Sequence, residues 1–340
     1  MKKICFFSPY IMQLHAGGGE KHFFDLALLR SKSKKNTIYI AVTQNSQHSL
    51  EEYRKLYAQF LGKNLNQLHF IWTPLFTEAS FWQKLWWTRQ FDELFYVTDG
   101  SLFLSLAKKN ILHVQIPFTQ PKNSIFERFK LACWQEINTN SQFTKQVIEK
   151  AWRVNVSEVL HPSIDPKEFN PAQKRLPIIL AVGRFFSHLH SKRQDVLIKC
   201  FAELRKTAPK KFKDWQLVFI GAVEDRAYFE KVQKLAEGLP ITFVTNATRQ
   251  ELLNYFNTAS IFWHAAGFGV NEYKEPEKVE HFGIVTLEAL AGGCFPLVVG
   301  KGGQREILGD KFAQHSWQTI DECVIKTIRC SSDKNVKFRA

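Results

Sequence analysis

Two carboxylates, Glu280 and Glu288, are the residues of this chain whose types and spacing best suit chemistry. Seven residues separate them, including the apolar turn 282–285, and the paired glycines Gly292 and Gly293 follow. This order predicts a loop that carries Glu280, then a short helix that carries Glu288 and ends at the glycines. A helix N-terminus binds a diphosphate through its backbone N–H groups, and a carboxylate accepts hydrogen bonds from sugar hydroxyls. The pattern favours a nucleotide-sugar site, and an amphipathic helix with two solvated glutamates is the alternative.

A glycine run near the start of the chain, Gly17-Gly18-Gly19, is a second candidate. It lies between an expected strand at 4–8 and an expected helix at 20–30. Strand, glycine loop and helix in this order cradle phosphate in doubly wound folds. The run is not a G-x-G-x-x-G fingerprint and no Walker lysine follows it, so a tight turn that only closes the βα unit is the alternative.

Alternating strands and helices must position these groups. The apolar periodicity predicts strands at 37–43, 69–72, 94–97, 111–116, 137–142, 178–182, 215–220, 241–244, 260–264 and 295–299. Between them it predicts helices at 50–61, 104–108, 145–151, 194–206, 228–237 and 249–259, with one or two more after 304. Such alternation is typical of parallel doubly wound sheets.

The segment from Glu280 to Gly293 resembles the E-x7-E signature of retaining glycosyltransferase family 4, and the segments 17–20 and 302–307 are also similar to that family. The resemblance implies an α/β fold of the GT-B type, in which two Rossmann-like doubly wound domains face each other across a cleft. We expect an N-terminal acceptor-binding domain at 1–163, a proline-rich linker at 164–177 and a C-terminal nucleotide-sugar-binding domain at 178–340. Family members usually end with a helix that crosses back to the first domain, and 337–340 offers no candidate for it.

The resemblance also implies how the donor is held. A Gly-Arg after a strand and a Lys that opens the next helix clamp the diphosphate in the family, and we assign them to Arg184 and Lys192, with Arg193 as the alternative. The first glutamate holds the sugar, the second holds the ribose, and the base is read largely by backbone. The implied catalytic residues are Glu280, Arg184 and Lys192. The implied donor-binding residues are Gly17, Gly18, Gly19, Arg184, Lys192, Asn246, Glu280, His281, Phe282, Gly283, Ile284 and Glu288.

On the acceptor side we place Asp99, His113 and Gln115, because ligands of open parallel sheets bind beyond the carboxyl ends of the strands. Relatives often carry a histidine at the end of the strand that we expect at 111–116, and Gln115 matches that position best. A core-facing role is the alternative for His113. The segment 140–144 is similar to the family's helix start that faces the acceptor.

The composition of the chain limits the classes of partner and ligand that we expect it to bind. The chain has 46 Lys and Arg against 32 Asp and Glu, a net charge of +14 that favours anionic partners. Its six cysteines form no C-x-x-C pair, which indicates reduced thiols and a cytoplasmic protein without a metal site. There is no D-x-D motif to support a metal-clamped diphosphate, and no apolar run approaches the ~18 residues of a membrane span. The aromatic and basic segment 81–89 predicts either a core helix or a patch on a membrane surface.

Together these observations predict a hexosyltransferase that needs no cofactor. It would move a mannosyl- or glucosyl-type hexose from a GDP- or UDP-sugar to a hydroxyl of a glycan or lipid-linked acceptor, with retention and without metal. Peripheral contact with an anionic inner membrane face stays open. The alternatives are an inactive sugar-nucleotide binder and a basic protein that binds membranes or nucleic acid. Scattered charge without an RNA-binding motif disfavours specific nucleic acid, and no segment for a pyridoxal lysine supports a GT-B phosphorylase.

Overall fold

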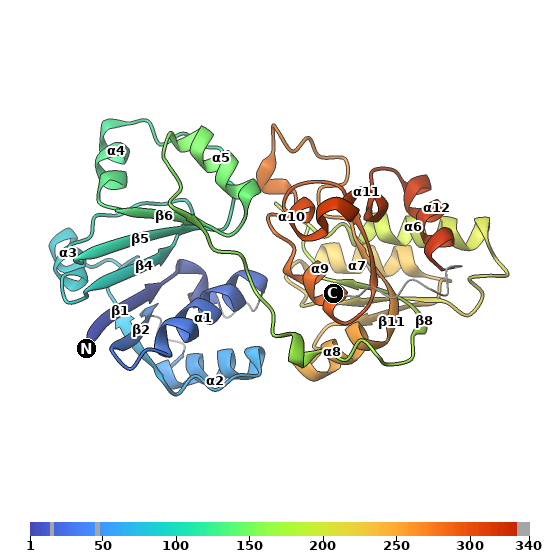
Figure 1. Cartoon of the computed structure of the whole chain (residues 1–340), viewed down its shortest axis with the longest axis horizontal. Helices are drawn as coiled ribbons and strands as arrows, with labels where there is room; N and C mark the ends of the chain where they lie inside the picture. The colour runs from blue at the N-terminus through green and yellow to red at the C-terminus, as the bar shows by residue number, and fades with distance from the viewer. Residues whose placement is uncertain (14–16, 45–47, 332–340) are drawn as a thin grey trace. The chain divides into compact units, whose positions relative to one another are not determined.

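The computed structural model describes residues 1–13, 17–44 and 48–331 (Figure 1). It divides into two compact units, Met1–Ser163 and Ile164–Ala340. The segment 337–340, where we found no candidate for a crossover helix, lies outside the described residues. Each unit is built around one parallel sheet with helices on both faces, as the alternation of elements predicts.

The first unit contains a seven-stranded sheet in the order β3-β2-β1-β4-β5-β6-β7, and its strand pairs are parallel. The strands are β1 (Lys2–Phe7), β2 (Asn36–Thr43), β3 (Leu68–Thr73), β4 (Glu93–Val97), β5 (Lys109–Val114), β6 (Glu136–Thr139) and β7 (Glu158–Val159). Successive side chains of β1 point to opposite faces, so Phe6 packs in one core and Phe7 in the other. The first core is covered by α1 (Gly18–Ser31) and α2 (Leu50–Leu61), and the second by α3 (Phe81–Thr88), α4 (Ile125–Ala132) and α5 (Gln142–Trp152).

The second unit contains a six-stranded parallel sheet in the order β10-β9-β8-β11-β12-β13. The strands are β8 (Leu176–Val182), β9 (Gln216–Ile220), β10 (Ile241–Val244), β11 (Ala259–His264), β12 (Phe295–Val299) and β13 (Ser316–Trp317). One face packs against α6 (Gln194–Thr207), α7 (Arg226–Ala236) and α12 (Ile320–Cys330), and the other against α8 (Arg249–Thr258) and α9 (Ile284–Ala291). The short helices α10 (Gln304–Leu308) and α11 (Phe312–His315) follow β12.

The strand order of each sheet reverses at one place, between β1 and β4 in the first unit and between β8 and β11 in the second. Ligands of open parallel sheets bind beyond the carboxyl ends of the strands at such a reversal. In the second unit this place lies between the end of β8, after which Gly183 follows, and His264, the last residue of β11. The topology thus selects these two strand ends as the place to look for a site.

Three local predictions are wrong. The segment 104–108 is not helical, and Leu106 donates its backbone N–H to Oγ1 of Thr88 at 2.8 Å instead of to a carbonyl oxygen within a helix. Strand β5 ends at Val114, so Gln115 lies just beyond the strand. The segment after 304 forms α10, α11 and α12 rather than one or two helices, and α4 is a helix that the periodicity did not reveal.

Candidate active site

The centre of the candidate site is the carboxylate of Glu280, which is 9% exposed and lies in the loop just before α9. Its Oε2 accepts a hydrogen bond from Nζ of Lys192 at 2.5 Å, and Nε2 of His264 lies 2.9 Å from the same oxygen. Burial by itself would raise the pKa of Glu280, but Lys192 and His264 outweigh it and hold that pKa well below its usual range. Burial lowers the pKa of His264 despite the adjacent carboxylate. The site therefore holds an ionised carboxylate beside one cation and one neutral imidazole.

Lys192 is held against the end of β8 by a close backbone approach. A Cβ on Gly183 would lie 2.4 Å from Cγ of Lys192, so only glycine leaves room for the lysine stem. Gln194, the first residue of α6, donates from Nε2 to the carbonyl oxygens of Gly183 and Arg184 at 3.2 and 3.1 Å. Gly183 therefore allows the stem of Lys192 to lie against the end of β8.

A second pair of glycines fixes the loop that carries Glu280. Gly303 donates its backbone N–H to the carbonyl oxygen of Glu280 at 2.8 Å. A Cβ on Gly302 would lie 2.1 Å from that same oxygen, and a Cβ on Gly303 would lie 2.3 Å from the carbonyl oxygen of His281. Because no side chain fits at these distances, the glycines let the loop before α9 lie directly against the start of α10.

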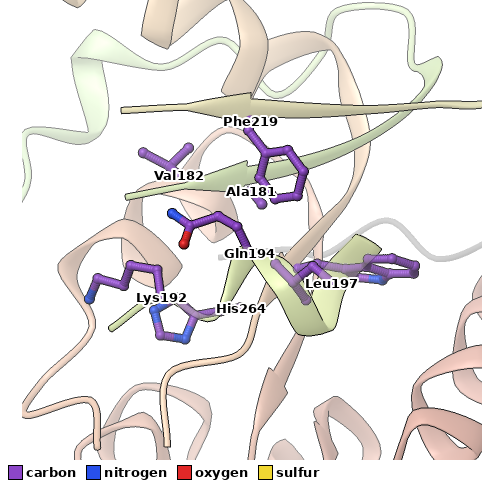
Figure 2. A pocket seen from close by; sticks show the side chains of 8 residues that line it. Ala181, Val182, Lys192, Gln194, Leu197, Phe219 and His264 are labelled. Atoms are coloured by element: carbon purple, nitrogen blue, oxygen red, sulfur yellow. The ribbon is translucent and has the colours of Figure 1, made fainter. Parts of the chain in front are cut away.

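A small pocket lies where these elements meet, with Lys192, Gln194 and His264 among its lining residues (Figure 2). Its other lining residues come from β8, β9, β11 and α6, namely Ala181, Val182, Leu197, Phe219 and Trp263. Figure 2 shows Lys192 and His264 together at one side of the pocket, as their shared contact with Glu280 requires. The pocket thus lies at the strand reversal that the topology selects.

Glu288 lies on α9, as the sequence predicts, and is 3% exposed. Its Oε1 accepts from Nη1 of Arg249 at 2.7 Å, and Nη2 of Arg249 donates to Oε2 of Glu168 at 2.7 Å. Burial by itself would lower the pKa of Arg249, but the two carboxylates raise it above its ordinary value. One arginine therefore joins Glu288 to the segment that precedes β8.

The glycines after α9 allow Arg175 to pack closely against the end of this helix. A Cβ on Gly293 would lie 2.5 Å from Nη2 of Arg175, and this same nitrogen donates to the carbonyl oxygen of Gly292 at 2.6 Å.

The structure does not bring Arg184 and Lys192 together on one partner. Nη1 of Arg184 donates to Oε1 of Glu224 at 2.7 Å, and the guanidinium lies over the ring of Phe186. Lys192 binds Glu280 instead. In this conformation the two cations of the predicted clamp have separate carboxylate partners.

The remaining predicted donor residues lie around the start of α9 or after β10. Gly283 is the N-cap of α9 with a φ of +102°, a left-handed conformation that favours glycine, and Ile284 is the first helical residue. His281 and Phe282 are buried, and Nε2 of His281 lies 3.1 Å from the carbonyl oxygen of Glu277. Asn246 is exposed in the loop after β10.

In the first unit the structure brings the glycine run and Gln115 together. Gly17 caps α1, and Nε2 of Gln115 donates to the carbonyl oxygen of Gly19 at 3.3 Å. A Cβ on Gly19 would lie 2.7 Å from Oε1 of Gln115, so a larger residue at this position would make the amide of Gln115 move. Asp99, just after β4, accepts from the backbone N–H and hydroxyl of Ser101 at 3.0 and 2.6 Å.

His113 faces the core, which is the alternative given for it above. The residue is fully buried, and its ring centroid lies 5.2 Å from that of His22 and 5.4 Å from that of Phe95. Burial lowers the pKa of His113 well below its ordinary value, with His22 adding to the shift. Its ring is thus a neutral packing group rather than a surface ligand.

Sequence reasoning missed His264 and Arg249. His264 is the last residue of a buried strand beside the strand reversal, and that position was readable from the alternation of elements. Arg249 opens α8 and gives no local signal, since its partners lie 81 and 39 residues away in the sequence.

Comparison with known proteins shows which family this chain resembles. The model of the family "Glycosyl transferases group 1" matches residues 164–339. An alpha-1,3/1,6-mannosyltransferase of Neurospora crassa is 28% identical over 53% of this chain and 44% of its own length. A human GDP-Man:Man(3)GlcNAc(2)-PP-Dol alpha-1,2-mannosyltransferase is 25% identical over 61% of this chain and 44% of its own length. The chain thus spans less than half the length of these two relatives.

Solved structures agree on the fold. WaaG, a glycosyltransferase involved in lipopolysaccharide biosynthesis, has a TM-score of 0.61 at 12% identity and covers 98% of this chain and 91% of its own. The N-terminal domain of trehalose-6-phosphate phosphatase from Candida albicans has a TM-score of 0.66 at 10% identity, covering 98% of this chain and 90% of its own. The predicted GT-B fold class is confirmed. With the family model matching the half of the chain that carries Glu280 and Glu288, this protein belongs to the glycosyl transferases group 1 family.

Proposed function

We propose that this protein is a retaining hexosyltransferase that transfers a mannosyl group from GDP-mannose to a hydroxyl of a glycan or lipid-linked acceptor. Family membership supports the reaction class, and the printed name of the human relative, which includes GDP-Man, supports the choice of donor. The observation that carries the proposal is the buried, ionised carboxylate of Glu280 between Lys192 and His264 at the strand reversal.

The carboxylate of Glu280 is better suited to bind the sugar of the donor than its phosphate groups. Glu280 would accept hydrogen bonds from the hydroxyls of the hexose, and these bonds are strong because the acceptor is charged. Lys192, which now binds Glu280, would donate to the diphosphate, so the two groups separate the sugar end of the donor from its phosphate end. Glu288 would bind the ribose while Arg249 keeps its Oε1 in place.

Transfer requires stabilisation of a leaving diphosphate. The C1–O bond to the phosphate breaks with its electron pair on the phosphate oxygen, the acceptor oxygen bonds to C1 on the same face, and the acceptor proton passes to the leaving phosphate. Lys192, Arg184 and the N-terminus of α9 would stabilise the developing charge without metal. Arg184 would have to exchange Glu224 for phosphate, and this exchange would couple the loop after β9 to donor binding.

The acceptor would bind at the carboxyl edge of the first sheet. Gln115 and Asp99 follow β5 and β4 there, next to the N-terminal turn of α1 that begins at Gly18. Amide and carboxylate groups of this kind hydrogen-bond the hydroxyls of a glycan.

The test combines donor binding with transfer. Unfolding is followed with GDP, UDP, GDP-mannose and UDP-glucose, with and without EDTA, and a ligand at a hundredfold excess over its Kd stabilises by about 2.7 kcal/mol. Mannose transfer from GDP-mannose to lipid-linked and free oligosaccharides is then measured, and NMR of the product gives the anomeric configuration. We expect stabilisation by GDP-mannose that EDTA leaves unchanged, and an α-linked product.

A matched pair of variants makes the test specific. Glu280→Gln removes the charge at the site, whereas Glu275→Gln removes a half-buried carboxylate that precedes it by five residues and pairs with Lys278. Transfer should be lost in the first variant and kept in the second. Stabilisation by none of the four ligands, or normal transfer by Glu280→Gln, would overturn the proposal.

A further inference from the structure

Helix α3 presents aromatic side chains to solvent instead of to the core. Phe81, Trp82 and Trp86 are 51, 65 and 55% exposed, although residues of this size are normally buried. Trp82, Trp86 and Arg89 recur with a spacing of four and three residues, so they form one stripe along the outer side of the helix. The inner side of α3 is carried by Thr88, which is fully buried.

Helix α4 has the same organisation. Ile125 is 91% exposed, and Phe126 and Phe129 are 60 and 59% exposed. Ile125 and Phe129 are four residues apart and share one side of the helix, while Leu131 on the opposite side is buried in the core. Two short helices thus each leave an apolar stripe uncovered.

The two stripes lie on helices that cover the same face of the first sheet. Trp87 of α3 and Leu131 of α4 pack against the same core on one face of the first sheet. The segment 103–106 contacts both helices' ends, since Leu106 donates to Thr88 at the end of α3, and Phe103 contacts Trp134 just after α4 with a centroid distance of 5.3 Å. Leu106 itself is exposed. We call the exposed side chains of Phe81, Trp82, Trp86, Leu106, Ile125, Phe126 and Phe129 the aromatic surface.

Cations accompany the aromatic surface. The guanidinium of Arg89 lies 4.8 Å from the ring centre of Trp86, and the ammonium of Lys130 lies 4.5 Å from that of Phe126. Lys84 adds a third cation on α3, whose sequence contains no acidic residue. The one carboxylate of α4, Glu127, is held by Ser124 and Lys122. Among the residues that the structure describes, the three cations Lys84, Arg89 and Lys130 have no carboxylate partner. Aromatic rings beside such cations match the headgroup region of a membrane that contains anionic lipid.

We propose that the aromatic surface of α3 and α4 docks the first unit on a bilayer that contains anionic phospholipid. The rings enter the boundary between headgroups and acyl chains, and Lys84, Arg89 and Lys130 contact lipid phosphate. The net charge of +14 adds long-range attraction to such a surface. No helix among the described residues is long and apolar enough to cross a membrane. The proposed contact is between the aromatic surface of the protein and the headgroup region of the bilayer. The proposal concerns membrane contact and does not depend on the transfer reaction.

The test is vesicle binding by the full chain. Binding is measured by co-sedimentation with vesicles of phosphatidylcholine alone and of phosphatidylcholine with phosphatidylglycerol. We expect binding to the mixed vesicles that weakens in high salt, because screening shortens the range of the attraction. The variants Trp82→Gln/Trp86→Gln and Phe126→Gln/Phe129→Gln should each reduce the partition coefficient by about tenfold or more.

Controls separate docking from general charge attraction. Leu29→Gln/Leu56→Gln changes two residues of α1 and α2 that are 58 and 43% exposed on the other face of the same unit, and should keep wild-type binding. Trp82→Phe/Trp86→Phe should bind but lose the part of the fluorescence quenching that brominated acyl chains cause in the wild type. Equal binding by wild type and both glutamine pairs would overturn the proposal, as would no binding to either vesicle. Dimerisation that the glutamine pairs abolish, without vesicle binding, would assign the surface to a second copy and also overturn it.

Discussion

The Nζ of Lys192 lies 2.5 Å from Oε2 of Glu280, although 88 residues separate the two in the sequence. Both side chains are mostly buried, so each charge is stabilised mainly by the other. A ligand that uses either group must therefore take over part of this ion pair. The pair links donor binding to the protonation and placement of the carboxylate at the centre of the site.

Lys192→Met should lower the transfer rate by about 10²–10³, by analogy with the loss of one donor to a developing negative charge. The same change leaves Glu280 buried without its cation and should raise its pKa, so residual activity would shift to higher pH. Lys199→Met, on the exposed side of α6, is the matched control. A pH–rate profile of both variants measures the effect, and identical profiles would contradict it.

Gly302→Ala should abolish transfer while leaving most of the protein folded. Its Cβ would lie 2.1 Å from the carbonyl oxygen of Glu280, so the loop that carries this carboxylate must move. Gly238→Ala is a close control, because Gly238 also has a positive φ, of +77° against +62°, but has nothing within 4 Å of the added carbon. Each substitution should lower the free energy of unfolding by about 1 kcal/mol, because it forces an alanine into a left-handed backbone conformation. Only Gly302→Ala should also lose activity. Equal activity in the two variants would show that the close approach does not position Glu280.

Arg249→Met should lower the free energy of unfolding by about 3 kcal/mol, because it leaves two carboxylates without their shared cation. Adding Glu288→Gln to this variant should recover part of the loss, and the double-mutant cycle measures the coupling of the two residues. Arg226→Met removes an arginine that is 79% exposed and should change stability by less than about 0.5 kcal/mol. Urea unfolding of the wild type, Arg249→Met, Glu288→Gln, the double variant and the Arg226→Met control tests this, and strictly additive changes in the cycle would contradict it.

Stability should fall as the pH drops below neutrality. Burial lowers the pKa of His22 to about 4, whereas an unfolded histidine titrates at about 6.5. Between these values the unfolded chain binds a proton that the folded chain does not, so the free energy of unfolding falls by up to about 1.4 kcal/mol per pH unit for this ring. The loss begins near the unfolded pKa and is complete below the folded one.

His22→Gln should flatten this dependence, and His69→Gln, at an exposed position of β3, should keep the wild-type slope. Urea unfolding at several pH values between 4 and 7 measures both. A wild-type slope in His22→Gln would mean that this ring gains a proton without opening the core.

Much of the fold could be predicted because its signals are local. Buried parallel strands appear as short apolar runs, and most predicted strands lie within two residues of the observed ones. The failures also have local causes. The helix expected at 104–108 has the right residues, but the backbone N–H of Leu106 binds the side chain of Thr88 and no helix forms. Helix α4 places Ile125 and Phe129 on its exposed side, so its periodicity does not indicate a buried face.

The sequence by itself determined the family, the alternation of strands and helices, and the places of Glu280 and Glu288 before and on one short helix. Spacing along the chain is enough for these, because helix periodicity and glycine stops act over a few residues. Only the tertiary structure decided that Glu280 meets Lys192 and His264, that Arg184 binds Glu224, that Arg249 holds Glu288 and that His113 is buried. These contacts join side chains that lie far apart in the sequence, and they depend on how closely neighbouring backbones approach, which glycines such as Gly183 and Gly302 allow and which no local pattern records.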